Sequence, residues 1–434
     1  MATNHKTLPI DAQSAASLDQ NGLRLTLVDT DDKVAFERWA QADNRGFNGE
    51  WMNEKDAEGL MLGMGERRTT GVYDDSGADP AMPIGTVNSW PVALTVPGGR
   101  ALDVWGISSV TVAPTHRRKG IARALLEGEL RTASALGLPM AALTVSEATI
   151  YSRFGFAPAV MAAELSIETH RARWIGPAAS GRVQFVPRAQ LREQATALIE
   201  SARIQTPGEI RAWPRLWDNR FGLTSMSEGD GKKIRAIRYD DADGEAQGFA
   251  VYTLKEDESD YSRHTVTVGY LLALTPDAYA GLWQHLLDLD LVSTLKAPLR
   301  SVDEPLYWQI ADQRAITSTV HDHLWLRILD VPASLSARTY SAPLDTVLEV
   351  TDTLGFAAGR YRLLIEGGTA TIAETVDAAA LTLSVNELSA LYLGGVSANT
   401  LARAGRIVEH SAGAAAALDG AFRGPVAPWL SVWF

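Results

Sequence analysis

Residues 106 to 123 read Gly-Ile-Ser-Ser-Val-Thr-Val-Ala-Pro-Thr-His-Arg-Arg-Lys-Gly-Ile-Ala-Arg, and this stretch decides the fold of the N-terminal part. An apolar strand, a basic turn and the start of a helix follow one another directly. The first helical turn leaves backbone N–H groups unpaired, and the helix dipole adds positive potential, so phosphate oxygens bind well there. Gly120 lets a ligand approach the backbone closely. The stretch therefore predicts a pyrophosphate-binding strand–turn–helix unit.

The spacing Arg117-x-x-Gly120-x-Ala122 resembles the acyl-CoA signature (Q/R)-x-x-G-x-(G/A) of the GCN5-related N-acetyltransferases (GNATs). In that family the signature follows a strand, as it does here. A surface turn with solvated arginines would carry the same residues, so the motif needs support from other segments.

Composition indicates a multidomain globular protein. The chain has 434 residues, of which 46% are hydrophobic and 21% charged, and this length suggests about three domains. Cysteine is absent, which excludes disulfides, thiol nucleophiles and Cys-ligated zinc. The net charge of −12 argues against general binding of nucleic acid and favours cationic small molecules or peptides. We expect a cytoplasmic protein whose first 21 residues are a loose polar tail.

The order of the expected elements divides the chain into three parts. The first is a mixed α/β unit with strands at 23–28, 71–73, 84–90, 104–112, 140–145 and 160–167. In the middle part, strands at 246–254 and 265–274 lead into a helix opened by Thr275-Pro276, which repeats the layout around Gly120 without its arginines. We infer a second domain of the same type that cannot bind a pyrophosphate; a common strand–turn–helix unit is the alternative. Beyond about His323, strands and Ala-rich helices indicate an α+β domain.

Tyr151 lies in the second candidate site, Ser146-Glu147-Ala148-Thr149-Ile150-Tyr151, one strand after the phosphate helix. We expect Ser146 to cap a short helix that ends near Gly155. In the acetyltransferase layout the two neighbouring strands splay apart to admit pantetheine, so a tyrosine on this helix can reach the sulfur. A phenol with a pKa of about 10 suits a departing thiolate with a pKa of about 8.5. Tyr151 is therefore a candidate proton donor, and an aromatic packed in the core is the alternative.

The chain ends in Trp429-Leu430-Ser431-Val432-Trp433-Phe434, which is unusually apolar for a terminus. Exposing these side chains would be costly, so we expect the end to be inserted into the protein together with the α-carboxylate of Phe434. Burial by Trp429, Val432 and Trp433 would raise the pKa of that carboxylate and make it a better base. A terminal strand with its carboxylate at the surface is the alternative.

With both motifs and this terminus, the chain resembles the enhanced intracellular survival (Eis) family of GNAT acetyltransferases. The matching segments run from about residue 23 to the end: Ala113-Pro-Thr-His-Arg-Arg-Lys-Gly, Ile150-Tyr-Ser-Arg-Phe-Gly-Phe, Leu324-Trp-Leu-Arg-Ile, Val347-Leu-Glu-Val-Thr-Asp, Leu391-Tyr-Leu-Gly and Phe434. The resemblance implies a homohexamer. It also implies an acetyltransferase domain at 22–168, a second GNAT-like domain without the CoA motif at 169–322, and a sterol-carrier-protein-like domain at 323–434.

The same resemblance implies acetyl-CoA as co-substrate and amines of aminoglycosides or of lysine-containing acceptors as substrates. Tyr151 then corresponds to the general acid and the terminal carboxylate of Phe434 to the general base. The acetyl-CoA contacts correspond to Val110, Thr111, Val112, Arg118, Lys119, Gly120, Ile121, Ala122, Arg123, Ser146 and Glu147.

Residues 43–51 occupy the position where acetyltransferases usually line the acceptor pocket. Asp43 and Glu50 could attract ammonium groups, while Phe47 and Trp51 could stack on rings. A solvated loop with a few apolar anchors is an equal alternative.

We expect no metal site. His321 and His323 alternate on a strand, but no third ligand is evident, which is typical of a polar strand end. Two rival functions remain at this point: a non-catalytic lipid or ligand carrier, and a regulatory acetyltransferase acting on protein lysines. The phosphate turn and Tyr151 favour the enzyme.

Overall fold

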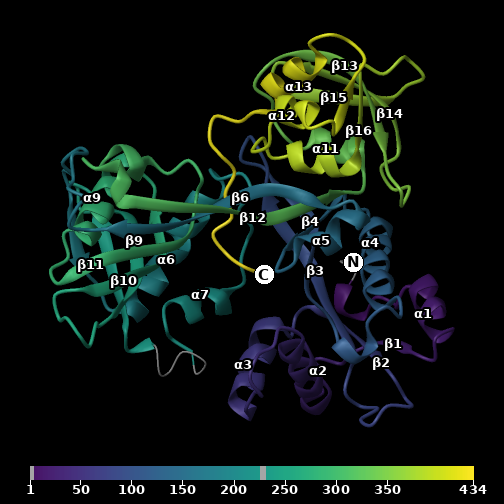
Figure 1. Cartoon of the computed structure of the whole chain (residues 1–434), viewed down its shortest axis with the longest axis horizontal. Coiled ribbons are helices and arrows are strands. Elements are labelled where there is room, and N and C mark those ends of the chain that lie inside the picture. The colour runs from purple at the N-terminus through teal and green to yellow at the C-terminus, as the bar shows by residue number, and fades with distance from the viewer. Residues whose placement is uncertain (1–3, 225–230) are drawn as a thin grey trace. The chain divides into compact units, whose positions relative to one another are not determined.

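A computed structural model describes residues 4–224 and 231–434 (Figure 1). The chain divides into two compact units. Unit 1 joins residues 1–159, 324–424 and 433–434, and unit 2 joins residues 160–323 and 425–432. Segments that are distant in sequence therefore build each unit.

The first part of unit 1 is a twisted sheet with helices against it. Its strands are neighbours in the order β1-β2-β3-β4-β5-β12, and each neighbouring pair is antiparallel except the parallel pair β4–β5. The elements are η1 (His5–Thr7), α1 (Ala12–Asp19), β1 (Arg24–Leu27), α2 (Lys33–Gly46), α3 (Glu54–Met64), β2 (Arg68–Tyr73), β3 (Gly85–Thr95), β4 (Ala101–Val112), η2 (Pro114–His116), α4 (Ile121–Ala135), β5 (Met140–Thr144), α5 (Ala148–Tyr151), η3 (Ser152–Phe154) and β12 (Ile316–Ile328).

The expectation of a loose N-terminal tail is wrong. Residues 12–19 form α1, which packs on α4 (Figure 1). Asp11 caps the helix at the N–H of Ser14, and its carboxylate pairs with Arg131 at 2.8 Å. The Ser14 hydroxyl donates to the carbonyl of Ala124 at 2.6 Å, and Leu18 is fully buried. The polar composition of this segment did not indicate a helix, because the contacts that hold the helix are to residues distant in the sequence.

The second part of unit 1 has its own sheet, in the order β15-β14-β13-β16-β17. Two contacts join it to the segment that carries Tyr151: the Asn386 amide donates to the carbonyls of Ser152 and Phe156, both at 2.8 Å. The elements are α10 (Val331–Ser336), β13 (Leu344–Thr351), β14 (Gly359–Glu366), β15 (Thr369–Glu374), β16 (Leu381–Ser384), α11 (Val385–Leu391), α12 (Ala398–Arg403), β17 (Ile407–Glu409) and α13 (Ala414–Phe422).

Unit 2 repeats the plan of the first sheet. Its strands are neighbours in the order β6-β11-β10-β9-β8-β7, and β10–β11 is the parallel pair, with α9 between the two strands in sequence. The elements are β6 (Ala157–Glu168), β7 (Arg182–Phe185), α6 (Arg188–Arg203), α7 (Pro214–Arg220), β8 (Ile234–Asp240), β9 (Ala246–Lys255), β10 (His264–Ala273), α9 (Pro276–Leu287), β11 (Val292–Arg300), η5 (Pro305–Trp308) and η6 (Gln313–Ala315).

Each unit has its own apolar core. Trp105 and Phe156 are fully buried in unit 1, as are Trp283 and Leu295 in unit 2. No helix in residues 4–224 or 231–434 is both long and apolar enough to cross a membrane.

Candidate functional site

The turn between β4 and α4 leaves the start of the helix open. Arg118 and Gly120 have φ angles of 65° and 79°, so two left-handed residues turn the chain into the helix. Among the described residues, no side chain caps α4, and no atom lies within 4 Å of the position of a Cβ at Gly120. The basic side chains of Arg117, Arg118 and Lys119 are exposed around this turn. Unpaired N–H groups, an open approach and exposed positive charges together fit a pyrophosphate.

The strands next to this turn separate where a thioester arm would have to pass. In the described chain β4 pairs with β5 at two positions, Trp105 with Ala141 and Gly106 with Ala142, and the ladder ends there. On its other edge β4 carries a bulge opposite β3, and Ser109 in the bulge has a φ of 56°. Residues 110–112 continue past the bulge to the phosphate turn. The geometry therefore leaves the β5-facing edge of these residues without a strand partner, as pantetheine binding requires.

Tyr151 ends α5, directly after β5. The residue is buried, with 7% of its surface exposed, and its ring lies edge-on to Phe156 at 6.3 Å. Burial, helped by the nearby negative charge of Glu147, raises the pKa of Tyr151 to about 12. This value corrects the sequence-based match to a phenol of ordinary pKa: the group stays protonated throughout the neutral range but is a weaker acid. The expected cap at Ser146 is also wrong, because Glu147 is the N-cap, and in the described chain it makes no side-chain capping bond.

The C-terminal residue lies at the end of β5. The N–H of Phe434 donates to Oγ1 of Thr144 at 3.2 Å, and the Thr144 hydroxyl is in turn placed to donate to the terminal Phe434 O. The Phe434 ring lies edge-to-face with Trp90 at 5.6 Å. Since Thr144 is the last residue of β5 and α5 follows it, both predicted catalytic residues lie at one strand end. Leu430, Ser431 and Val432 are buried as expected, but Trp433 is 48% exposed.

A polar chain inside unit 1 starts from Asp43. Ser109 Oγ donates to Asp43 Oδ2 at 3.2 Å, and Asn88 Nδ2 donates to Ser109 Oγ at 3.1 Å. Arg67 Nη1 donates to Asn88 Oδ1 at 3.2 Å, and the Arg67 guanidinium lies 3.6 Å from the centre of the Trp90 ring. The chain of contacts therefore ends at the aromatic ring that packs on Phe434. Sequence reasoning missed Ser109, Asn88, Arg67 and Trp90, because only the fold brings them together.

Asp43 is an internal acid. Burial raises its pKa to about 7, although the Ser109 hydrogen bond and the Arg67 charge both oppose that rise. Among the described atoms, Asp43 Oδ1 has no hydrogen-bond partner. The structure separates this residue from the other three acceptor candidates: Glu50 is exposed, as are Phe47 (51%) and Trp51 (79%), on the segment between α2 and α3.

The helix α9 of unit 2 starts in a different way from α4. The Thr275 hydroxyl accepts the N–H of Ala278 at 3.1 Å, Pro276 has no N–H to offer, and Asp277 places a carboxylate in the first turn. Beyond the last β10–β11 pair, Arg300 Nη1 donates to the carbonyl of Leu271 at 2.9 Å. A capped, acidic helix start cannot hold phosphates in the way that α4 can.

The histidine pair lies inside β12 rather than at a polar strand end. His323 is fully buried, and its Nε2 pairs with the carbonyl of Val432 at 2.9 Å. Burial lowers its pKa to about 4. The described residues contain no cluster of metal-binding side chains.

Comparisons with known proteins assign all three regions. Residues 30–159 and residues 208–328 each match an acetyltransferase (GNAT) domain family, and residues 331–431 match a sterol carrier protein domain. The chain therefore consists of two GNAT domains in tandem followed by a sterol-carrier-type domain. Such domains imply the use of acetyl-CoA.

Relatives match over most of the chain. An uncharacterized N-acetyltransferase of Streptomyces avermitilis is 34% identical over 404 residues, which cover 91% of this chain and 96% of the relative. N-acetyltransferase Eis of Mycobacterium tuberculosis is 35% identical over 342 residues, or 77% and 81% of the two chains. The crystal structure of Eis1 from Mycobacterium abscessus is 29% identical and covers 94% of this chain and 100% of its own, with a TM-score of 0.80. The geometry of the α4 turn and these matches show that the chain is an N-acetyltransferase and belongs to the Eis family.

Proposed function

We propose that unit 1 transfers the acetyl group of acetyl-CoA to amines of aminoglycosides or of other polyamine or lysine-containing acceptors. The observation that carries the proposal is the uncapped start of α4, entered through left-handed Arg118 and Gly120 beside the separated strands β4 and β5. Acetyl-CoA would supply an activated acetyl thioester. We place the pyrophosphate against Arg118, Lys119, Gly120, Ile121, Ala122 and Arg123, and the remaining contacts at Val110, Thr111, Val112, Ser146 and Glu147.

The acceptor must lose a proton before it can attack. An amine with a pKa of about 10.4 is protonated at neutral pH, and we assign its deprotonation to the carboxylate of Phe434, directly or through water. The nitrogen then bonds to the acetyl carbon as the carbon–sulfur bond breaks, and the nitrogen releases its second proton to solvent to leave a neutral amide. Tyr151 gives its phenolic proton to the departing sulfur and recovers one from solvent. The raised pKa of Tyr151 keeps that proton in place between turnovers.

Acceptor binding is assigned to Asp43, Phe47, Glu50 and Trp51. Glu50 is an exposed carboxylate on the same segment as two exposed aromatic rings, which suits a flat cationic molecule. The net charge of −12 also favours cationic acceptors. We further propose a cytoplasmic homohexamer with domain boundaries at 22–168, 169–322 and 323–434.

The test is acetyl-CoA consumption with three acceptors: an aminoglycoside, a linear polyamine and a lysine-containing peptide, each followed by mass spectrometry. Several acetyl groups on one aminoglycoside would support a roomy pocket. Turnover confined to the peptide would favour the regulatory alternative, and bound lipid without turnover on any acceptor would contradict the proposal.

The phosphate site can be tested separately. Arg118→Ala should raise KM for acetyl-CoA about tenfold, because it removes one charge-assisted contact. Arg24→Ala, in an exposed ion pair with Asp75, is the matched control and should leave KM unchanged. Equal KM values in both variants would contradict the assignment.

A further inference from the structure

The last residues that belong to unit 2, 429–432, are held by hydrogen bonds at four of their backbone groups. Residues 425–434, all of them described, form neither helix nor strand. The N–H of Trp429 nevertheless donates to the carbonyl of Pro207 at 2.9 Å, and the N–H of Ser431 donates to Glu209 Oε1 at 2.9 Å. This segment is bound in the manner of a peptide ligand, with partners supplied by loops and side chains rather than by a neighbouring strand.

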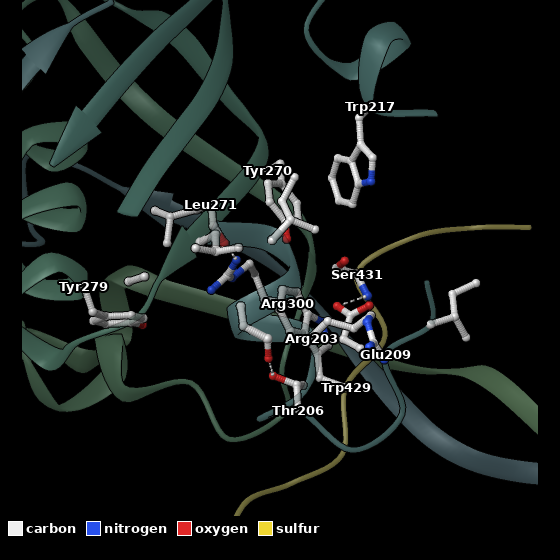
Figure 2. Close-up of a pocket in the computed structure, with 15 residues that line it drawn as sticks. Arg203, Thr206, Glu209, Trp217, Tyr270, Leu271, Tyr279, Arg300, Trp429 and Ser431 are labelled. Atoms are coloured by element: carbon white, nitrogen blue, oxygen red, sulfur yellow. Dashed lines mark hydrogen bonds between the residues drawn. The ribbon is translucent and has the colours of Figure 1, made fainter. Parts of the chain in front are cut away.

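The carbonyl side of the segment is held as well. Arg220 Nη2 donates to the carbonyl of Ser431 at 2.8 Å, and His323 Nε2 pairs with the carbonyl of Val432 at 2.9 Å. Figure 2 shows the hydrogen bond between Ser431 and Glu209 where the segment passes the pocket. Because Ser431 and Val432 are almost completely buried, losing one of these partners would leave a polar group unpaired away from water.

The loop that receives the segment is shaped for close approach. Gly208 has a φ of 96°, and a Cβ at this position would lie 3.0 Å from the carbonyl oxygen of Trp429. Glycine is therefore required here both by the backbone angle and by the neighbouring segment. Glu209 follows directly, and only 7% of its surface is exposed.

The binding position lies at the separation of β10 and β11, which corresponds by topology to the separation of β4 and β5 in unit 1. A cavity of about 110 Å³ remains here, lined by Trp429 and Ser431 on one side and by Tyr270, Tyr279 and Arg300 on the other (Figure 2). The Arg300 guanidinium lies 5.0 Å from the centre of the Trp429 ring. In unit 2 the chain's own C-terminal segment thus lines the strand gap that corresponds to the proposed cofactor gap of unit 1.

We propose that the second GNAT domain is a receptor for the C-terminal segment of its own chain, with Glu209 and Arg220 as its positioning residues. Its helix start cannot hold phosphates, while its strand gap and the 206–210 loop bind residues 429–432. Phe434 follows Val432 by two residues, so fixing the segment restricts where the terminal carboxylate can reach. This last consequence rests on the proposed role of Phe434, whereas the receptor role does not.

Carboxypeptidase digestion of the full-length protein tests the receptor. Release of Val432 and the residues before it requires the segment to leave its site, so its rate follows the population of the detached state. We expect release in Glu209→Ala and Arg220→Met to be at least about tenfold faster than in the unmodified chain, because each removes one partner of a buried group. Glu209→Gln keeps a carbonyl oxygen as acceptor and should digest slowly.

Arg238→Met is the matched control. It removes an arginine that pairs with Asp240 at 2.6 Å elsewhere in the same unit, and it should leave the release rate unchanged. Equal release in all variants, or acceleration by Arg238→Met to the same extent, would overturn the proposal. If the Glu209 and Arg220 variants do not fold, amide exchange of the unmodified protein decides: the N–H groups of Trp429 and Ser431 should exchange as slowly as those of β10, and fast exchange would overturn the receptor.

The two proposals fail differently. If Phe434 is not the base, a chain extended beyond it will still acetylate amines, yet tail release will still depend on Glu209. If the receptor proposal is wrong, the rate of tail release will not depend on Glu209, whether or not extension of the chain abolishes acetylation.

Discussion

The N–H of Phe434 donates to Oγ1 of Thr144 at 3.2 Å, which ties the last residue of the chain to the last residue of β5. The same hydroxyl is placed to donate to the terminal Phe434 O. The Thr144 hydroxyl therefore contacts both the backbone N–H and the terminal oxygen of Phe434. Tyr151 lies on the helix that follows β5, so one strand end positions the proposed base and the proposed acid.

Replacing Thr144 by valine should lower kcat without unfolding the protein. Valine has nearly the same shape, but it leaves the Phe434 backbone without its hydroxyl partner, so the carboxylate loses its fixed position. We expect a loss of about tenfold in kcat, the effect of one hydrogen bond, with KM for acetyl-CoA unchanged. Thr144→Ser keeps the hydroxyl and should retain activity; equal losses in both variants would show that the hydroxyl has no such role.

Two variants distinguish the role of the terminal carboxylate from the role of the Phe434 side chain. Phe434→Ala keeps a C-terminal carboxylate but removes the ring that packs on Trp90, whereas one added glycine moves the carboxylate away and keeps the ring. If the carboxylate is the base, the extension should reduce kcat by about a hundredfold or more, and Phe434→Ala should be affected less. Steady-state rates with one aminoglycoside decide this, and the reverse order would assign the role to the ring.

Tyr151→Phe should reduce kcat by about a hundredfold to ten-thousandfold, the range for loss of a proton donor, and should leave the fold intact because the ring still packs on Phe156. Burial raises the pKa of Tyr151 to about 12. The phenol is therefore protonated below that pH, and Tyr151 should cause no loss of rate between about pH 7 and pH 10. An alkaline fall in kcat near pH 10 that disappears in Tyr151→Phe would contradict the raised pKa.

Local patterns were predictable from the sequence. The phosphate turn could be found because its strand, arginines and Gly120 are contiguous, and the structure confirms the strand and the helix that follows the turn. The repeat in unit 2 was visible for the same reason, since Thr275-Pro276 opens α9 directly after β10.

Features that depend on distant partners were not predictable. Arg67, Asn88 and Ser109 form a buried chain, but in the sequence they are separate polar residues near or within strands. The pKa of Tyr151 depends on how deeply the fold buries it, and the helix at 12–19 depends on its contacts with α4. Such properties arise from tertiary packing, which a single sequence does not display.

The pH dependence of the free energy of unfolding should show the protonation of His323. Burial is the main reason why its pKa falls to about 4 from the ordinary 6.5. Between these two pH values the unfolded chain binds a proton that the folded chain does not, so the free energy of unfolding falls as the pH falls. The contribution is fully present above about pH 6.5 and is lost by about pH 4, a change of about 3 kcal/mol.

Replacement of His323 by glutamine removes the titrating group and keeps an N–H that can reach the Val432 carbonyl. Denaturant unfolding of both proteins at about pH 7.5 and pH 4 should show a smaller acid loss for His323→Gln. Parallel losses in the two proteins would show that this histidine is not the proton-binding group.

The buried pair of Arg327 and Asp352 should be essential for unit 1. Arg327 Nη2 donates to both carboxylate oxygens, at 2.8 and 2.7 Å, and the two side chains are completely buried. Asp352→Asn leaves the guanidinium charge without a counter-charge, which costs about 3–5 kcal/mol. Because Arg327 Nε also donates to the carbonyl of Phe154 at 2.8 Å, the variant should in addition loosen the segment that carries Tyr151 and lower kcat.

A matched control for this pair comes from the exposed pair of Asp345 and Arg362, whose side chains are 47% and 52% exposed. Asp345→Asn should leave the free energy of unfolding almost unchanged, as is usual for surface pairs. Replacing both buried partners by apolar residues, Arg327→Met with Asp352→Leu, should cost less than Asp352→Asn alone, since no buried charge is then left unpaired. Equal costs for Asp352→Asn and Asp345→Asn in denaturant unfolding would show that burial adds nothing to this interaction.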